Sequence, residues 1–131
     1  MTETGKQRVE SPDAPGALGP YSPAVRSGAG TYLFVSGQIG VDPGSGEFVS
    51  GEVTAQAGQC LDNLLALVWA AGGSQASVVK VNIYLKSIKD FAAVNEVYAS
   101  YFKEPYPARA CIGGCELPKG ALVEIEAIAA L

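Results

Sequence analysis

The sequence has 131 residues, of which 48% are hydrophobic and 17% charged, and its formal net charge is −4. This length fits one domain with its own core, and the composition excludes a largely disordered chain. The acidic balance gives no electrostatic footprint for nucleic acid or an anionic membrane, and no run reaches the roughly 18 apolar residues of a membrane span.

The types of residue present limit which catalytic and metal-binding groups the chain can use. The chain contains no histidine, so it lacks the commonest metal ligand and the commonest general base. Its three cysteines, Cys60, Cys111 and Cys115, include no CxxC pair and make a poor zinc site. We therefore expect reduced thiols, no metal, and a carboxylate as the group that handles protons.

Residues 1–20 are polar and rich in proline and glycine, which predicts a loose N-terminal arm without a targeting signal. The pattern changes after Ala24. Two apolar runs, AVRSG from residue 24 and TYLFVSG from residue 31, flank Gly28-Ala29-Gly30, and this small turn predicts a hairpin. We expect a soluble, intracellular protein.

The middle of the chain predicts two helices around one strand. Apolar residues recur at steps of three and four from Val53 to Ala71, and Gly72-Gly73 ends this first helix. Residues 78–86 alternate between apolar and polar, which predicts a half-buried strand. The second helix ends before Pro105 and carries one apolar stripe: Phe91, Val94, Tyr98, Tyr101 and Phe102.

The stretches PARACIGGC (107–115) and ALVEIEAIAA (121–130) predict two strands joined by a turn at LPKG. The order is then β-β-α-β-α-β-β, an α+β fold with two helices packed on one face of a mixed sheet. In the last strand, Glu124 and Glu126 share the face opposite Val123 and Ile125. Two helices cannot cover both faces of such a sheet, so we expect a homo-oligomer whose sheets close against one another.

Arg109 stands among small apolar residues with no adjacent acid. If its strand pairs antiparallel with the last strand, Arg109 can share a pocket with Glu124 or Glu126, which lie about 7 Å apart along their strand. One interpretation is a structural salt bridge at a subunit contact. The other is a site in which the planar Arg109 fork binds a substrate carboxylate while a glutamate orients water or carries a proton.

Four further residues are weighed between a structural and a functional role. Ser36 ends an apolar strand, either as a pocket edge or as an ordinary turn. Tyr21 is held in a proline-rich loop, where packing and ligand contact are equally open. Asn95, beside the apolar stripe of the second helix, fits a local hydrogen bond. Cys111 lies on the same strand face as Arg109 and lacks an activating partner, which favours a packed thiol over a nucleophile.

Six stretches together resemble the RidA/YjgF family of reactive intermediate deaminases, formerly the endoribonuclease L-PSP family, in its archetypal RidA-type branch: GPYSPAV, FVSGQIGVDPGSGE, LDNLLALVWAAGG, FAAVNEVYASYF, PARACIGGCELPKG and VEIEAIA. The resemblance begins near residue 14, which leaves residues 1–13 as a flexible arm before a single domain at 14–131. It implies a chorismate-mutase-like fold and a homotrimer around a central barrel, with clefts between neighbouring subunits.

The resemblance also implies an activity. Members of this family hydrolyse the enamine and imine intermediates 2-aminoacrylate and 2-aminocrotonate, which pyridoxal-phosphate-dependent dehydratases release. The implied reaction is that of a 2-iminobutanoate/2-iminopropanoate deaminase, with 2-oxo acids and ammonia as products and no cofactor.

Site residues follow from the resemblance by position. Arg109 matches the carboxylate-binding arginine, and Glu124 matches the acid that positions the attacking water. Cys111 matches a cysteine whose backbone faces the ligand, so its thiol is not needed as a nucleophile. The remaining pocket positions match Tyr21, Ser36 and Asn95. We expect Tyr21 and Ser36 to come from one subunit and Arg109 from its neighbour.

The chain departs from the family pattern in two places. Gly113-Gly114 replaces bulkier strand residues, which puts the preferred substrate size in question, and Pro23 is expected to stiffen the loop over the cleft. Two alternatives stay open: a non-catalytic trimer that binds a metabolite and regulates a partner, and a ribonuclease or translation inhibitor. The acidic charge counts against RNA. We expect a cytoplasmic protein without membrane association, with a mitochondrial pool left open.

Overall fold

The computed structural model describes residues 6–13, 17, 19–28 and 30–131. The predicted order of elements is confirmed, with one additional short strand inside the expected arm. In chain order the elements are β1 (Gln7–Val9), β2 (Ala24–Arg26), β3 (Tyr32–Ile39), α1 (Val53–Ala70), β4 (Val78–Leu85), α2 (Phe91–Tyr101), β5 (Ala108–Ile112) and β6 (Val123–Ala130). Short 3₁₀ turns lie at Gln75–Ser77, Ile88–Asp90 and Pro118–Gly120. Whether the arm at 1–13 is flexible stays a prediction.

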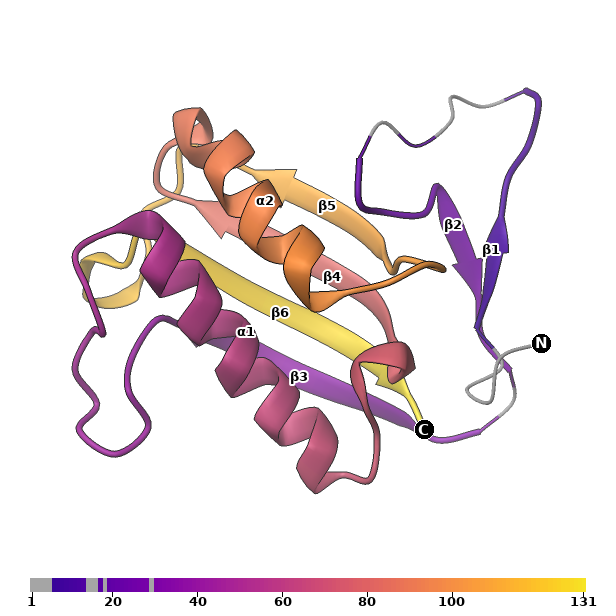
Figure 1. Ribbon diagram of the computed structural model, residues 1–131, viewed down its shortest axis with the longest axis horizontal. Coiled ribbons are helices and arrows are strands. Elements are labelled where there is room, and N and C mark those ends of the chain that lie inside the picture. The colour runs from indigo at the N-terminus through magenta and orange to yellow at the C-terminus, as the bar shows by residue number, and fades with distance from the viewer. Residues whose placement is uncertain (1–5, 14–16, 18, 29) are drawn as a thin grey trace.

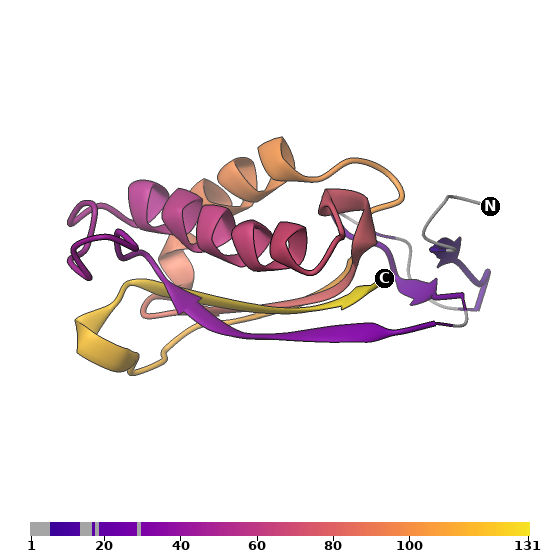
Figure 2. The same cartoon turned by 90° about the horizontal axis from the view of Figure 1, so that it is seen from below.

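Four strands form a mixed sheet in the order β3-β6-β4-β5, and both helices cover one face of it (Figure 1, Figure 2). Strand β6 runs antiparallel to β3 and β4, whereas β4 and β5 are parallel. Strands β1 and β2 pair with each other in a separate ribbon on the β5 side of the molecule (Figure 1). The predicted α+β class, with a mixed sheet and two helices on one face, is confirmed.

Alternation along each strand decides which side chains are buried. In β6, Val123 and Ile125 are fully buried against the helices, while Glu124 and Glu126 are only partly buried on the other face, as predicted. Helix α1 packs its apolar side on β3 and β6 and ends before Gly72, whose φ of 92° suits glycine. The centre of the core is contributed by Ala57, Cys60, Leu61, Leu64, Val68, Val81, Ile83, Leu85, Val94 and Tyr98. Within the described residues, no helix combines the length and apolar character needed to cross a membrane.

The predicted hairpin around residues 28–30 is wrong. Strand β2 pairs with β1, and β3 pairs with β6, so this stretch links two sheets; Ala29 itself lies outside the described residues. The pairing of β3 is decided by packing against residues that are distant in the sequence. Leu33 and Val35 join the face under α1 only when β3 lies beside β6, and a turn pattern carries no information about that partner.

The predicted antiparallel pair between the strand of Arg109 and the last strand is also wrong. Strand β5 pairs in parallel with β4, which separates it from β6. Helix α2 is the reason, because it carries the chain back along the sheet and so makes β5 a parallel neighbour of β4. The turn at Pro118–Gly120 therefore passes the end of β4 instead of closing a hairpin.

The face of the sheet opposite the helices is uncovered in the single chain (Figure 2). It presents large apolar side chains to water, since Phe34 is 73% exposed, Ile112 53% and Tyr32 46%. The two glutamates of β6 lie among them. Exposed apolar surface on this scale is typical of a face that another molecule covers.

Candidate functional site

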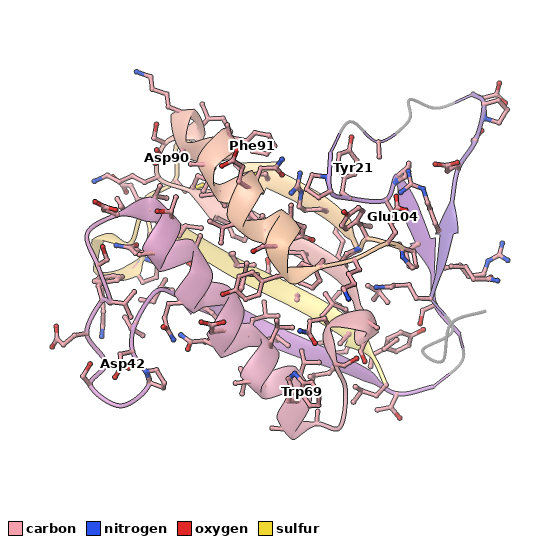
Figure 3. The ribbon with its side chains drawn as sticks, viewed as in Figure 1. Tyr21, Asp42, Trp69, Asp90, Phe91 and Glu104 are labelled. Carbon is pink, nitrogen blue, oxygen red and sulfur yellow. The ribbon has the colours of Figure 1, made fainter. Side chains whose placement is uncertain are left out.

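Arg109 lies in the middle of β5 and points to the helix-covered face, because its neighbour on β4 is a fully buried valine. Its Nη1 donates a hydrogen bond to Asn95 Oδ1 on α2, at 2.7 Å. Three aromatic rings face the guanidinium, with Cζ lying 4.8 Å from the ring centre of Tyr98, 5.4 Å from Tyr21 and 5.6 Å from Phe91. Figure 3 shows Tyr21 on the N-terminal loop and Phe91 at the start of α2.

This cation has no acidic partner among the described residues, where the ion pair found joins Arg8 Nε to Glu10 at 2.7 Å in the N-terminal ribbon. Burial lowers the pKa of Arg109, but a guanidinium stays charged at physiological pH. One Nη1 hydrogen is used by Asn95. The site is therefore suited to an anion, and the planar fork matches a carboxylate.

Tyr21 reaches Arg109 from a loop fixed to the edge of the sheet. The amide of Ser22 donates to the carbonyl of Pro107 at 2.9 Å, and its hydroxyl donates to the carbonyl of Tyr106. Ser22 thereby adds a parallel bridge beside the start of β5. Tyr21 and Arg109 thus meet within one chain, and the expectation that they come from different subunits is wrong.

Cys111 lies two residues beyond Arg109 on the same face of β5 and packs against the core, as predicted. Burial raises the pKa of its thiol, and the charge of Arg109 offsets this only in part. A thiol with a raised pKa is not an activated nucleophile, which fits the packing interpretation. In the described part of the chain, no three His, Cys, Asp or Glu side chains are grouped to hold a metal ion.

Glu124 lies on the opposite face, beside an irregular step in β3. The pairing of β3 with β6 shifts between Val35 and Gln38, so Ser36 and Gly37 bulge there. A Cβ at Gly37 would lie 1.9 Å from Glu124 Oε2, so the glycine leaves room for the carboxylate. Ser36 is exposed next to it. The two predicted residues on this face are therefore neighbours.

The two glutamates of β6 differ in their partners. Glu126 accepts hydrogen bonds from the Tyr84 hydroxyl and from Asn82 Nδ2, the latter at 3.4 Å. The bond to Glu126 raises the pKa of Tyr84. Glu124, by contrast, makes no side-chain hydrogen bond to any residue in the described ranges. Of the two, Glu124 is the carboxylate left to bind a water molecule.

The predicted site residues thus form two groups on opposite faces of the sheet. The expectation that Arg109 shares a pocket with Glu124 or Glu126 within one chain is wrong, because side chains alternate along strands and the strand of Arg109 is not paired with β6. One group comprises Arg109, Asn95, Tyr21 and Cys111, and the other Glu124 and Ser36. A site that uses both groups requires two chains.

A cavity of about 360 Å³ lies between the N-terminal arm and the end of α2. It is lined by Lys6, Tyr101, Lys103 and Glu104, among others, and by none of the predicted site residues. This cavity is therefore not the predicted site.

Sequence reasoning missed Phe91 and Tyr98 as neighbours of Arg109, because both fit the apolar stripe of the second helix. With Asn95 they stand at steps of four and three, which places all three on one side of α2. This spacing was the one sign in the sequence that the two aromatic residues lie beside Asn95. It did not reveal which strand the side faces, since this depends on the parallel pairing of β5 with β4.

Comparisons with known proteins give one family. A family model described as "Endoribonuclease L-PSP" matches residues 11–131. "RutC family protein y4sK" from Sinorhizobium fredii is 50% identical over 123 residues, covering 94% of this chain and 96% of that protein. The human "2-iminobutanoate/2-iminopropanoate deaminase" is 45% identical over 129 residues, covering 98% and 93%.

Solved structures agree with this result. RidA from the Antarctic bacterium Psychrobacter sp. superposes with a TM-score of 0.75 at 44% identity, covering 95% of this chain and 99% of that one. TdcF from E. coli with bound serine gives a TM-score of 0.73 at 41% identity, covering 95% and 98%. The chain is thus similar to these proteins over nearly its whole length.

Proposed function

Since the chain belongs to the Endoribonuclease L-PSP family, which includes the RidA/YjgF proteins, we propose that it is a hydrolytic deaminase of small 2-imino acids. The observation that carries the proposal is the partly buried Arg109 guanidinium, which lacks an acidic partner in the described part of the chain and so accommodates a carboxylate. Relatives named as imine deaminases and a relative that holds serine support the same ligand class.

The proposed assembly is a homotrimer in which Glu124 of one chain faces Arg109 of the next. Two observations support it: the open face of the sheet exposes large apolar side chains, and the two groups of site residues lie on different surfaces. A contact between two different surfaces is heterologous, and a heterologous contact that closes forms a ring rather than a two-fold dimer. The smallest closed ring of this kind has three chains.

The proposed mechanism begins when an enamine tautomerises to its imine, R–C(=NH)–COO⁻. Arg109 holds the carboxylate bidentately, and Glu124 binds a water molecule, accepting a proton as the water oxygen attacks the imine carbon. Glu124 returns this proton to the nitrogen, the hydroxyl of the tetrahedral intermediate loses a second proton to the same nitrogen, and ammonia leaves as the carbonyl of the 2-oxo acid forms. The reaction consumes one water and needs no redox step, so the proposal includes no cofactor. Holding one carboxylate against one water supplies the acceleration by positioning.

Tyr21, Asn95 and Cys111 line the Arg109 side of this proposed site, and Ser36 lies beside Glu124. In this arrangement Asn95 contacts Arg109 rather than presenting its carbonyl oxygen to the ligand. The Cys111 thiol takes no part in the chemistry, which its raised pKa supports.

The test is an assay in which threonine dehydratase generates the imine and the release of 2-oxobutyrate is followed. The protein should accelerate this release, and Arg109→Ala should abolish the acceleration. Arg109→Lys should fail as well, because an ammonium cannot reproduce the planar fork. Acceleration that persists in Arg109→Ala would show that this assignment of Arg109 is wrong.

The same assay separates the alternatives. Binding of 2-oxobutyrate without any effect on rate would favour a non-catalytic metabolite-binding trimer. The family description names an endoribonuclease, but a net charge of −4 offers little counterion release on binding RNA. Nuclease-free protein should accordingly show no RNA binding at low salt.

A further inference from the structure

Helix α2 presents three side chains to Arg109 from successive turns. Phe91, Asn95 and Tyr98 stand at steps of four and three along the helix, and all three contact the guanidinium. Asn95 was expected at the site, whereas the two aromatic residues were assigned only to the core. The contact of both rings with the guanidinium needs a separate explanation, because packing of an apolar core does not account for a cation beside them.

Aromatic rings stabilise a guanidinium differently from a carboxylate. A ring attracts the cation through its π face, and this attraction is stronger where the pair is desolvated. It provides no oxygen that competes for the in-plane N–H groups. A glutamate in the same place would occupy the fork that a ligand carboxylate must use. Rings therefore keep the charge in a partly buried position while leaving its hydrogen-bonding edge for the ligand.

We propose that Phe91 and Tyr98 are positioning residues that hold the plane of the Arg109 guanidinium so that its free N–H edge meets the substrate carboxylate. This inference rests on the proposed function for its substrate, but the clamp itself is a property of the folded chain. Tyr21 adds a third ring from the N-terminal loop. Asn95 Oδ1 restricts the remaining rotation of the guanidinium by accepting a hydrogen bond from Nη1 at 2.7 Å.

The two rings differ in how they are held. Tyr98 is fully buried, and its ring centre lies 4.8 Å from that of Phe102. Its hydroxyl has no hydrogen-bond partner in the described part of the chain, so the ring rather than the hydroxyl serves Arg109. Phe91 is 38% exposed, and its replacement leaves no cavity in the core. Phe91 is therefore the residue to change.

The first measurement is kinetic. Phe91→Leu removes the π face and keeps an apolar side chain of similar size, whereas Phe91→Tyr keeps the face. Phe91→Leu should raise KM for the imine and Kd for 2-oxobutyrate roughly five- to tenfold, with kcat changed less than about twofold, since the interaction lost is one with the bound carboxylate. Phe91→Tyr should retain the wild-type values. Trp69→Leu, an exposed aromatic on α1 away from this group, is the matched control (Figure 3).

The second measurement does not depend on turnover. ¹⁵N relaxation of the Arg109 Nε–H in ligand-free protein should give an order parameter near the rigid value of about 0.85 in the wild type, and below about 0.6 in Phe91→Leu. Wild-type order parameters, KM and Kd in Phe91→Leu would overturn the clamp. Increased motion with unchanged KM and Kd would also overturn it, because the orientation would then not matter for binding.

The two proposals fail in distinguishable ways. If the wild-type protein does not hydrolyse imines, the proposed function falls. The clamp then still stands if Phe91→Leu loosens Arg109 and weakens binding of 2-oxobutyrate. If the wild type is an active deaminase and Phe91→Leu is indistinguishable from it, the clamp falls alone.

Discussion

Replacing Gly37 with alanine is expected to inactivate the protein without unfolding it. An alanine Cβ at this position would lie 1.9 Å from Glu124 Oε2, 2.8 Å from Cδ and 3.1 Å from Cγ. The clash is with the end of one flexible side chain, so the carboxylate will move rather than the backbone. To reach an ordinary contact of 3.4 Å, Oε2 must shift by about 1.5 Å.

The expected size of the effect follows from that shift. A displacement of about 1 Å in a positioned catalytic group costs about 100-fold in rate. If Glu124 holds the attacking water, Gly37→Ala should therefore lower kcat by about 100-fold, equivalent to about 2.7 kcal/mol in the barrier. Stability should not fall, because Gly37 is not among the glycines with positive φ, and losing a glycine constrains the unfolded chain by about 0.4–1 kcal/mol.

The assay is the dehydratase-coupled release of 2-oxobutyrate, combined with thermal unfolding and size-exclusion chromatography of the same samples. Gly51→Ala is the matched control, because a Cβ there meets no atom within 4 Å and the position has no positive φ. It should keep wild-type activity. A Gly37→Ala protein that is folded, assembled and fully active would refute the role of Glu124 at this position.

Two further predictions concern stability. Tyr98→Phe should leave the free energy of unfolding unchanged or raise it by about 1 kcal/mol, since it removes a buried hydroxyl without a partner in the described ranges and keeps the ring; a clear loss in urea titrations at equal protein concentration would contradict this. Burial lowers the pKa of Lys6 from 10.5 to about 8. Between these values the unfolded chain binds a proton that the folded chain has released, so stability should rise with pH across this window. Lys6→Met should lose this part of the pH dependence, and an unchanged slope would show that Lys6 is not its source.

The elements of the fold could be predicted because they depend on local periodicity. The alternation around Ile125 in β6 and the three- and four-residue steps from Val53 along α1 each identify a buried side without reference to the rest of the chain. The order of strands in the sheet could not be read in this way. The partner of β5 depends on where α2 returns the chain, and that is decided by packing between residues far apart in sequence.

For the candidate site, the residues could be predicted from the sequence, but their arrangement in space could not. Arg109 was conspicuous because a cation stands in an apolar strand, and Glu124 because it alternates with buried residues. Their placement on opposite faces was not predictable, since it follows from the pairing of β5 with β4. The contact between Gly37 and Glu124 needs the bulge in β3, for which the sequence gives no register.

The most direct test of an intersubunit site is complementation between two inactive chains. Arg109→Ala and Glu124→Gln should each be inactive alone, and co-expression with different affinity tags yields mixed assemblies that can be isolated. If each site takes Arg109 from one chain and Glu124 from its neighbour, every mixed trimer, whichever variant it holds twice, has both groups in about one third of its sites. Isolated mixed trimers should therefore release 2-oxobutyrate at about a third of the wild-type rate. Mixed assemblies as inactive as their parents would contradict it.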